Sequence, residues 1–512
     1  MKYSFLIVII FALFINAQPK NEVRAVWITT AFNLDWPTTQ GAKNQKREII
    51  DILDSLKLAN FNTIYLQVRA RGDLLYPSDY EPFAKSLTGK LGEDPGYDPL
   101  KYFIEESHKR GIEIHAWWNV YKVFGKEIPE MTTPKHVVLD KPELCKYYKN
   151  EWWMDPGIPN TNKYLLKLII ELVTKYDLDG INFDYMRYPG EDFPDELTIE
   201  TYSKGYDKYK WRRENINNFV SQIYDSINSL KPHLKVGSSP LGIYKNNFAK
   251  SFFFEGYFNA SQDSKKWMET EKHDYISPQI FWNIDSIPNY NVLLREWISL
   301  ANGRQVISGI AAYKLLSKAN NWKLSEISAQ IDSIRKIGAD GISIYRLSYL
   351  RNNDKDIYEL LKENKFKNAA GISPLSWKDT TKLDSPKNFE LKFNHKDQLY
   401  ISFIDSLKQE IKLFNIYLSK TIPVDITDIK NIYRLRVTNT DSVIIDKKHI
   451  TSQPNYLTVT ALSRTNVESN NSDYIVIRKM KLLGLTVLQI NNKSYFLNEE
   501  KLSQPIQQEY LK

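Results

Sequence analysis

DGINFDYMRYPG, residues 179–190, is the stretch that decides the fold of this chain. Successive side chains of an extended strand point to opposite faces, so Asn182 and Asp184 share one face while Ile181 and Phe183 share the other. Asp184 closes the strand and faces inward. The stretch therefore predicts a short buried strand that ends in a carboxylate and is followed by a polar loop.

The same change from a short β-branched run to an amphipathic helical run is repeated between Glu22 and about Asn364. The predicted strands are Val23–Thr29, Thr63–Val68, Glu113–Trp118, Gly180–Phe183, Lys235–Ser238, Tyr275–Gln279, Gln305–Gly309 and Gly341–Ile344. The predicted helices are Gln45–Ala59, Leu100–Arg110, Tyr164–Tyr176, Trp211–Leu230, Tyr290–Leu300 and Ile327–Ile337. Eight βα units in about 340 residues favour an α/β fold, a (β/α)8 TIM barrel with enlarged loops. A doubly wound open sheet is the alternative, and it usually has fewer units.

The pattern changes after the barrel region, residues 22–364. Residues 365–387 carry Gly371, Pro374 and Pro386 among polar residues, which is typical of a linker. Alternating strands then predict a small all-β sandwich over residues 388–480. This part resembles a fibronectin type III domain through FNIYLSKTIPVDI from Phe414 and YLTVTALSRTNVES from Tyr456. Residues 481–512 contain two further strand-like runs, to which we assign no role.

The first residues resemble a secretory signal peptide. Lys2 precedes an uncharged apolar run, Phe5–Ile15, and a small residue, Ala17, ends the segment. Cleavage after Ala17 would leave residues 1–17 out of the mature protein. A membrane anchor is the alternative, but the 11 apolar residues of this run are short of the roughly 20 that span a bilayer. We therefore expect a protein exported to the periplasm or secreted, without stable membrane insertion after cleavage.

Composition excludes several classes of function. The 69 Lys and Arg residues exceed the 61 Asp and Glu residues by only 8, which gives no indication of nucleic acid binding in a chain of 512 residues. A single cysteine, Cys145, rules out a disulfide framework. The seven histidines show no HxH or HExxH spacing, and no glycine-rich phosphate loop or GxSxG motif occurs. We therefore expect no metal and no cofactor.

Candidate reacting groups lie where strands end, because barrel enzymes carry them on the loops that follow. Asp184 could act as a general acid, a base, a nucleophile or an electrostatic stabiliser, or it could merely cap the next loop. Asp179, at the other end of the strand, is better explained as a turn residue. Arg187 could keep Asp184 ionised or bind an anionic group of the substrate.

Aromatic and polar side chains at the other strand ends suit a sugar, because flat rings pack on sugar faces and amides bond to hydroxyls. For His115 a hydrogen-bonded core position is an equal alternative. The residues predicted to contact substrate are Arg69, His115, Trp117, Asn119, Tyr185, Arg187, Gln279, Trp282, Tyr313 and Tyr345.

Several stretches together resemble the glycoside-hydrolase-like family 10 proteins. They are RAVWITTAFNLDWP from Arg24, NTIYLQVRARGDLLYPS from Asn62, LTGKLGEDPGYDPL from Leu87, HAWWNVY from His115, DGINFDYMRYPG from Asp179, WRRENINNFV from Trp211, SSPLGIY from Ser238 and DYISPQIFW from Asp274. The resemblance implies an exported bacterial TIM-barrel hydrolase whose characterised relatives act on peptidoglycan glycan stripped of stem peptides. Many relatives have two consecutive aspartates where this chain has Asp184 and Tyr185.

The second catalytic carboxylate is not evident. The strand motif is distantly similar to that of family 18 chitinases, but Met186 stands where their catalytic glutamate would be, so that mechanism is not available. Asp73, Glu255 and Asp285 are candidates. A carboxyl separation of about 5 Å from Asp184 would indicate retention, and about 6.5–9.5 Å inversion. We expect a hydrolase of β-linked amino-sugar glycan, with a non-catalytic cell-wall glycan-binding protein as the alternative.

Overall fold

The structure is a computed structural model that describes residues 18–248, 252–387, 389–394, 396, 398–403, 413–438, 443–482, 485–497 and 502–505. The predicted signal peptide, residues 1–17, lies outside this range. Two compact units are present: one extends from the first described residue to Ala370, except for Lys109–Gly111, and the other begins at Gly371. None of the helices in the described residues is both long enough and apolar enough to cross a bilayer.

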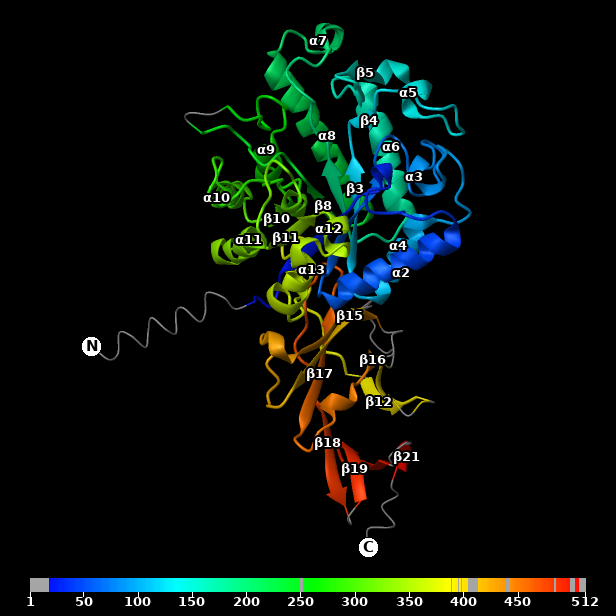
Figure 1. Cartoon of the computed structure of the whole chain (residues 1–512), viewed down its shortest axis with the longest axis vertical. Coiled ribbons are helices and arrows are strands. Elements are labelled where there is room, and N and C mark those ends of the chain that lie inside the picture. The colour runs from blue at the N-terminus through cyan, green and yellow to red at the C-terminus, as the bar shows by residue number, and fades with distance from the viewer. Residues whose placement is uncertain are drawn as a thin grey trace, which may run out of the picture. The chain divides into compact units, whose positions relative to one another are not determined.

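The first unit is built on a closed barrel of parallel strands (Figure 1). Its strand order is β1 (Val23–Ile28), β11 (Gly341–Tyr345), β10 (Gln305–Ala311), β9 (Tyr275–Ile276), β8 (Lys235–Ser238), β7 (Gly180–Asp184), β3 (Glu113–Asn119) and β2 (Thr63–Arg69). All eight predicted strands are confirmed, and with them the TIM barrel. Strand β9 is shorter than predicted, because Pro278 lacks the N–H that a ladder needs.

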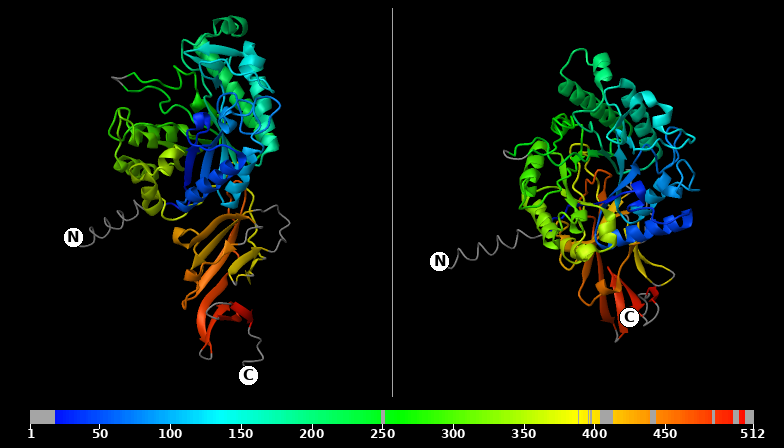
Figure 2. Two further views of the ribbon diagram at one scale, coloured as in Figure 1. Left: turned by 45° about the vertical axis from the view of Figure 1, so that its right-hand side comes forward. Right: turned by 45° about the horizontal axis from the view of Figure 1, so that its top comes forward.

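Helices surround the strands (Figure 2). The six predicted helices correspond to α2 (Ala42–Leu58), α4 (Pro99–Lys109), α6 (Pro159–Lys175), α8 (Lys208–Leu230), α10 (Tyr290–Leu300) and α11 (Leu324–Ile337). Shorter helices are α3 (Lys85–Thr88), α5 (Val137–Asp140), α7 (Glu196–Tyr202), α9 (Ser264–Glu269), α12 (Leu347–Arg351) and α13 (Ile357–Leu360). In α2, Ile49, Ile52, Leu53 and Leu56 form the buried stripe that their spacing predicts.

A small antiparallel sheet follows β3 and was not predicted from the sequence. Its strands, in the order β4 (Lys122–Phe124), β6 (Glu151–Met154) and β5 (Cys145–Tyr148), lie near the top of Figure 1. Strands β5 and β6 are joined by Lys149 and Asn150, both with positive φ, as a two-residue hairpin turn requires. The aromatic residues on either side of this turn are the sequence signal that could have revealed the hairpin.

The second unit consists of antiparallel sheets. One contains β12 (Phe389–Phe393), β13 (Leu399–Phe403) and β16 (Val443–Ile444). The other runs in the order β15 (Ile432–Thr438), β14 (Leu413–Ser419), β17 (Asn455–Leu462), β18 (Ile475–Leu482), β19 (Leu485–Ile490), β20 (Lys493–Leu497) and β21 (Leu502–Pro505). Its assignment to the fibronectin type III class stays a prediction.

Two domain boundaries differ from those expected. Lys365 forms an ion pair with Asp332 at 2.7 Å, and Phe366 is fully buried in the barrel core, so the barrel unit does not end at residue 364. The sandwich was expected to end at residue 480, but β18 extends past that residue and pairs with β19 in the same sheet. The residues of β19, up to Ile490, therefore belong to the second unit's sheet and not to a separate C-terminal segment.

The two units have separate hydrophobic cores, since one cluster ends at Phe366 and the other begins at Leu399. We therefore expect residues 18–370 to fold when expressed alone. Circular dichroism should show a cooperative thermal transition, and any glycan cleavage by the full chain should be retained. An insoluble or inactive fragment would instead show that the barrel depends on residues after Ala370.

Candidate active site

The carboxyl ends of the barrel strands surround a cavity of about 320 Å³. This is the end of a TIM barrel at which catalytic groups gather. Strands β1, β3, β7, β10 and β11 all contribute side chains or backbone, together with the loops after β8 and β9. The lining residues are Trp27, Trp117, Asp184, Tyr185, Arg187, Ser239, Ser277, Pro278, Gln279, Phe281, Gly309, Tyr313, Ser343 and Tyr345.

Asp184 is the last residue of β7 and is only 9% exposed. Its Oδ1 accepts the backbone N–H of Tyr185 at 2.7 Å and lies 3.4 Å from Nε2 of Gln279. Burial raises the pKa of the Asp184 carboxyl, although the N–H of Tyr185, the charge of Arg187 and the Trp117 indole each act to lower it. A carboxyl with a raised pKa in a cavity is suited to donate a proton.

Tyr185 turns the chain sharply at this point. Its φ of 51° lies in the left-handed region, which residues with a side chain rarely adopt. Such conformations are concentrated at functional sites, where the surrounding structure holds them. The turn directs the backbone N–H of Tyr185 back to Asp184 and brings Arg187 to the cavity wall.

Arg187 is half-buried and lies against aromatic rings. Its guanidinium carbon is 5.1 Å from the centre of the Tyr185 ring and 5.7 Å from that of Trp153, which belongs to β6. Burial lowers the pKa of this guanidinium below its usual value, while Tyr185 and Asp184 act to raise it. The small sheet therefore contributes one side of the environment around Arg187.

Aromatic rings form much of the remaining wall. Tyr313 and Tyr345 meet edge to face with centroids 6.1 Å apart, and Phe281 lies 5.9 Å from Tyr345. Ser239 is buried, and its Oγ has no hydrogen-bond partner among the described residues. Flat rings beside unsatisfied hydroxyls are suited to a sugar, which has apolar ring faces and many polar edges.

The sequence profile of the glycosyl hydrolase-like 10 family matches residues 22–324. The chain belongs to this family. It is 34% identical over 395 residues to "Glycosyl hydrolase YngK" of Bacillus subtilis, covering 73% of this chain and 77% of that protein. It is 30% identical over 373 residues to "Glycosyl hydrolase DigH" of Escherichia coli K12, covering 65% and 84%. Among solved structures it resembles the glycoside hydrolase domain of PgaB from Bordetella bronchiseptica, with 14% identity and a TM-score of 0.47 over 66% of this chain and 98% of that one.

This glycosyl hydrolase-like barrel brings seven of the residues selected from its sequence to the cavity: Trp117, Asp184, Tyr185, Arg187, Gln279, Tyr313 and Tyr345. Sequence reasoning missed other lining residues, among them Trp27, Ser239 and Phe281. Trp27 lies on β1, a strand that is buried throughout, so no alternation of polar and apolar residues marked its inward face.

Arg69 does not line the cavity, which differs from the prediction. Its side chain is fully buried and pairs with Glu81, with Nε and Nη2 each 2.6 Å from a carboxylate oxygen. The β2–β3 register shifts between Gln67 and Arg69, so Arg69 lies opposite Trp118 and stacks on it at 4.4 Å. The irregularity breaks the alternation on which the prediction depended. Arg69 therefore has a structural role.

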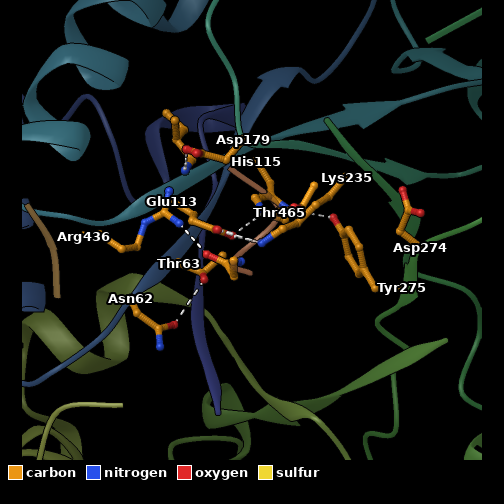
Figure 3. A network of polar contacts seen from close by, with 12 residues as sticks. Asn62, Thr63, Glu113, His115, Asp179, Lys235, Asp274, Tyr275, Arg436 and Thr465 are labelled. Atoms are coloured by element: carbon orange, nitrogen blue, oxygen red, sulfur yellow. Dashed lines mark hydrogen bonds and ion pairs between the residues drawn. The ribbon is translucent and has the colours of Figure 1, made fainter. Parts of the chain in front are cut away.

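Asn119 and His115 also occupy structural positions rather than the cavity wall. The Nδ2 of Asn119 donates to the carbonyl of Ala70 at 2.8 Å. In Figure 3, His115 lies in a polar network inside the barrel, with Nδ1 2.9 Å from the Tyr275 hydroxyl. Burial lowers the pKa of His115 and favours its neutral form. The core alternative for His115 is the one that the structure supports.

The network around His115 centres on a buried ion pair. Lys235 Nζ lies 2.5 and 2.7 Å from the two carboxylate oxygens of Glu113, and His115 Nε2 lies 3.3 Å from the nearer one (Figure 3). Both residues of the pair begin their strands, β3 and β8, at the end of the barrel opposite the cavity. This cluster therefore stabilises the barrel, because residues at that end serve folding.

None of the other predicted carboxylates lines the cavity. Asp73 is buried and accepts the N–H of Arg71 at 2.9 Å, and burial raises its pKa. Glu255 accepts backbone N–H groups of Asn246 and Phe258 in its own loop. Asp285 is exposed in the loop after β9. Among the described residues, Asp184 therefore supplies the only carboxyl group of the cavity wall.

Trp282 also lies outside the cavity lining. It is half-buried and packs against Gly242, and its carbonyl accepts Nε2 of Gln330 at 3.1 Å. Its neighbour Phe281 takes the place at the wall that Trp282 was predicted to have. Within the described part of the chain, no group of three or more His, Cys, Asp or Glu side chains is arranged to hold a metal ion.

Proposed function

We propose that this protein is an exported glycoside hydrolase that cleaves β-linked amino-sugar glycan by carboxylate acid–base chemistry. Peptidoglycan glycan strands that lack stem peptides are the proposed substrate. The observation that carries this proposal is Asp184, a buried carboxyl with a raised pKa at the carboxyl end of β7, facing an aromatic and polar cavity. The family relationship and the names of the two glycosyl hydrolase relatives support it.

Asp184 would act as the general acid. Its raised pKa retains the proton that the glycosidic oxygen must take as the bond to the anomeric carbon breaks. A water molecule supplies the hydroxyl of the new reducing end and leaves one proton to restore the acid. The backbone N–H of Tyr185 and the amide of Gln279 would stabilise the carboxylate that forms between these steps.

The walls would hold the sugar next to the bond that breaks. Tyr313, Tyr345 and Phe281 offer ring faces and edges, and Ser239 offers a free hydroxyl. Binding through such contacts places the glycosidic oxygen within reach of Asp184, which is what a positioned acid requires.

Cleavage can be tested with denuded glycan strands, prepared by removing the stem peptides with an amidase. We expect mass spectrometry to show shorter saccharides that accumulate with time when the mature protein is added. An unchanged strand length after prolonged incubation would contradict the proposed function.

A non-catalytic glycan-binding protein is the second candidate, and one observation favours it. Hydrolases of this kind use two carboxyl groups, whereas the described cavity wall supplies only Asp184. A binding protein would retain denuded strands in a pull-down without shortening them. Measuring binding and chain length in the same sample therefore separates the two candidates.

Export rests on residues 1–17, so the mature chain should begin at Gln18. Its side chain is bound to the barrel, since Nε2 donates to the carbonyls of Asn364 and Lys365 and Oε1 accepts the N–H of Asn368. N-terminal sequencing of protein recovered outside the cytoplasm is the measurement. Recovery of an intact Met1 from that fraction would count against cleavage.

A further inference from the structure

Arg187 lies at the cavity wall and forms no salt bridge with a carboxylate of the described residues. Among the described residues, no Asp or Glu oxygen forms an ion pair with its guanidinium, and its one hydrogen bond is a 3.5 Å contact to the carbonyl of Tyr188. A bond of that length is weak. The guanidinium therefore keeps most of its donors available to a ligand in the cavity.

The neighbouring charges do not change this picture. Lys122 lies over the Tyr185 ring at 5.1 Å, but its Nζ is 2.5 Å from Oε1 of Glu151, so the two charges cancel. Asp184 and Arg187 attract one another across the cavity wall, but no salt bridge joins them, and burial raises the pKa of the Asp184 carboxyl, which favours its neutral form. Arg187 is thus the cation at the described cavity wall that an incoming anion would meet.

We propose that Arg187 binds a free carboxylate carried by the sugar beside the scissile bond, and that the site thereby selects carboxylated amino-sugar chains over neutral ones. This inference rests on the proposed function and identifies the substrate group that the site recognises. A planar guanidinium binds a carboxylate through two parallel hydrogen bonds, which fixes orientation as well as charge. Stacking on Tyr185 and Trp153 restricts the plane of the guanidinium before substrate arrives.

Recognition of a free carboxylate would favour stripped strands over strands that carry stem peptides. In a peptidoglycan strand, the ether-linked carboxylate of one sugar is free only when no stem peptide is joined to it. An attached peptide turns that carboxylate into an amide, which removes the charge and adds bulk. A neutral hexosamine polymer lacks the group entirely. Both would leave the guanidinium of Arg187 without its ionic partner.

The test compares denuded glycan with a chitin oligosaccharide of equal length, using the full mature chain. We expect the native protein to prefer the carboxylated strand, because hydrogen bonds to charged groups contribute about ten- to a hundredfold in kcat/KM. Arg187→Gln should lose most of that preference, with a larger fall on denuded glycan than on chitin. Arg187→Lys should recover the preference only in part, because lysine keeps the positive charge but lacks the planar guanidinium that donates two parallel hydrogen bonds.

Arg213→Gln is the matched control. Arg213 also stacks on a tyrosine, at 4.1 Å from the Tyr257 ring, and also makes a 3.5 Å contact to a carbonyl, but it does not line the cavity. We expect this variant to keep the native preference. Denuded glycan whose carboxylates have been converted to methyl esters should behave like chitin.

Three results would overturn the inference while leaving hydrolysis intact. These are equal rates of the native protein on denuded glycan and chitin, an unchanged preference in Arg187→Gln, or full activity on the esterified strand. Hyaluronan oligosaccharides distinguish the source of the carboxylate, because their acid group is part of the ring. Cleavage of hyaluronan in preference to denuded glycan would uphold carboxylate recognition and contradict the peptidoglycan assignment. Failure to cut any of these glycans would contradict the proposed function itself.

Discussion

Replacing Asp184 with asparagine should lower turnover of denuded glycan at least about a hundredfold, because a positioned acid contributes roughly 10² to 10⁴ in rate. Asparagine keeps the shape of the side chain and can still accept the N–H of Tyr185, so glycan binding should change little. The measurement is the rate of new reducing ends at saturating substrate, together with strand binding in the same buffer. Retention of most of the activity would remove Asp184 from the mechanism.

Asp179→Asn is the control at the other end of the same strand. Its Oδ2 accepts the N–H of Ile114 at 3.0 Å and lies 2.9 Å from Nε2 of His108, and Asp179 is not among the residues that line the cavity. We expect this variant to melt at a lower temperature than the native protein. Its effect on turnover, measured well below the transition, should be small beside that of Asp184→Asn.

The pH dependence should show the raised pKa of Asp184 in two ways. A general acid must be protonated, so activity should fall as pH rises through a pKa above the ordinary value of 3.8 for aspartate. Because the folded-state pKa exceeds that of the unfolded chain, folding favours the protonated form, and the free energy of unfolding falls as pH rises between the two values. Asp184→Asn should remove this contribution and melt higher than the native protein at neutral pH.

Arg69→Met should lower the free energy of unfolding by about 3–5 kcal/mol, because it leaves the buried carboxylate of Glu81 without its cationic partner. Both side chains of this pair are fully buried. Arg69 also donates through Nη1 to the carbonyl of Val120 at 3.0 Å, and that bond would be lost as well. Such a loss is a large part of the roughly 5–15 kcal/mol that stabilises a typical protein. Chemical denaturation followed by tryptophan fluorescence would measure it.

Two comparisons isolate the buried charge as the cause. The double variant Arg69→Met with Glu81→Leu should recover part of the lost stability, because no unpaired charge then remains. Lys85→Gln breaks an exposed pair with Glu130, whose side chains are 58% and 51% exposed, and should cost less than about 1 kcal/mol. If Arg69→Met were as stable as the native protein but no longer bound glycan, the assignment of a structural role to Arg69 would be wrong.

The barrel could be predicted from the sequence because its signals are local. Each strand is a short apolar run, and each long helix has a stripe of the 3.6-residue period, as in α2. Asp184 was likewise predictable, since strict alternation along β7 and its place at the strand end sufficed. The residues that follow β7, Tyr185 and Arg187, were found for the same reason.

Other parts of the site depend on features that a single sequence does not display. Arg69 was misplaced because the register shift in β2 reverses the face of one residue, and no local pattern marks such a shift. Ser239 and Phe281 reach the cavity from loops, whose course is set by long-range packing rather than periodicity. Trp153 packs against Arg187 because it lies on β6 of the small antiparallel sheet, which the sequence did not predict.

Digestion of denuded glycan in water enriched in the heavy oxygen isotope tests the central claim most directly, with the native protein and Asp184→Asn compared in parallel. We expect the native protein to release shorter saccharides that carry one heavy oxygen at each new reducing end. Asp184→Asn should bind the strand and release almost none. Unlabelled or absent fragments from the native protein, or equal labelling by both proteins, would contradict hydrolysis at this cavity.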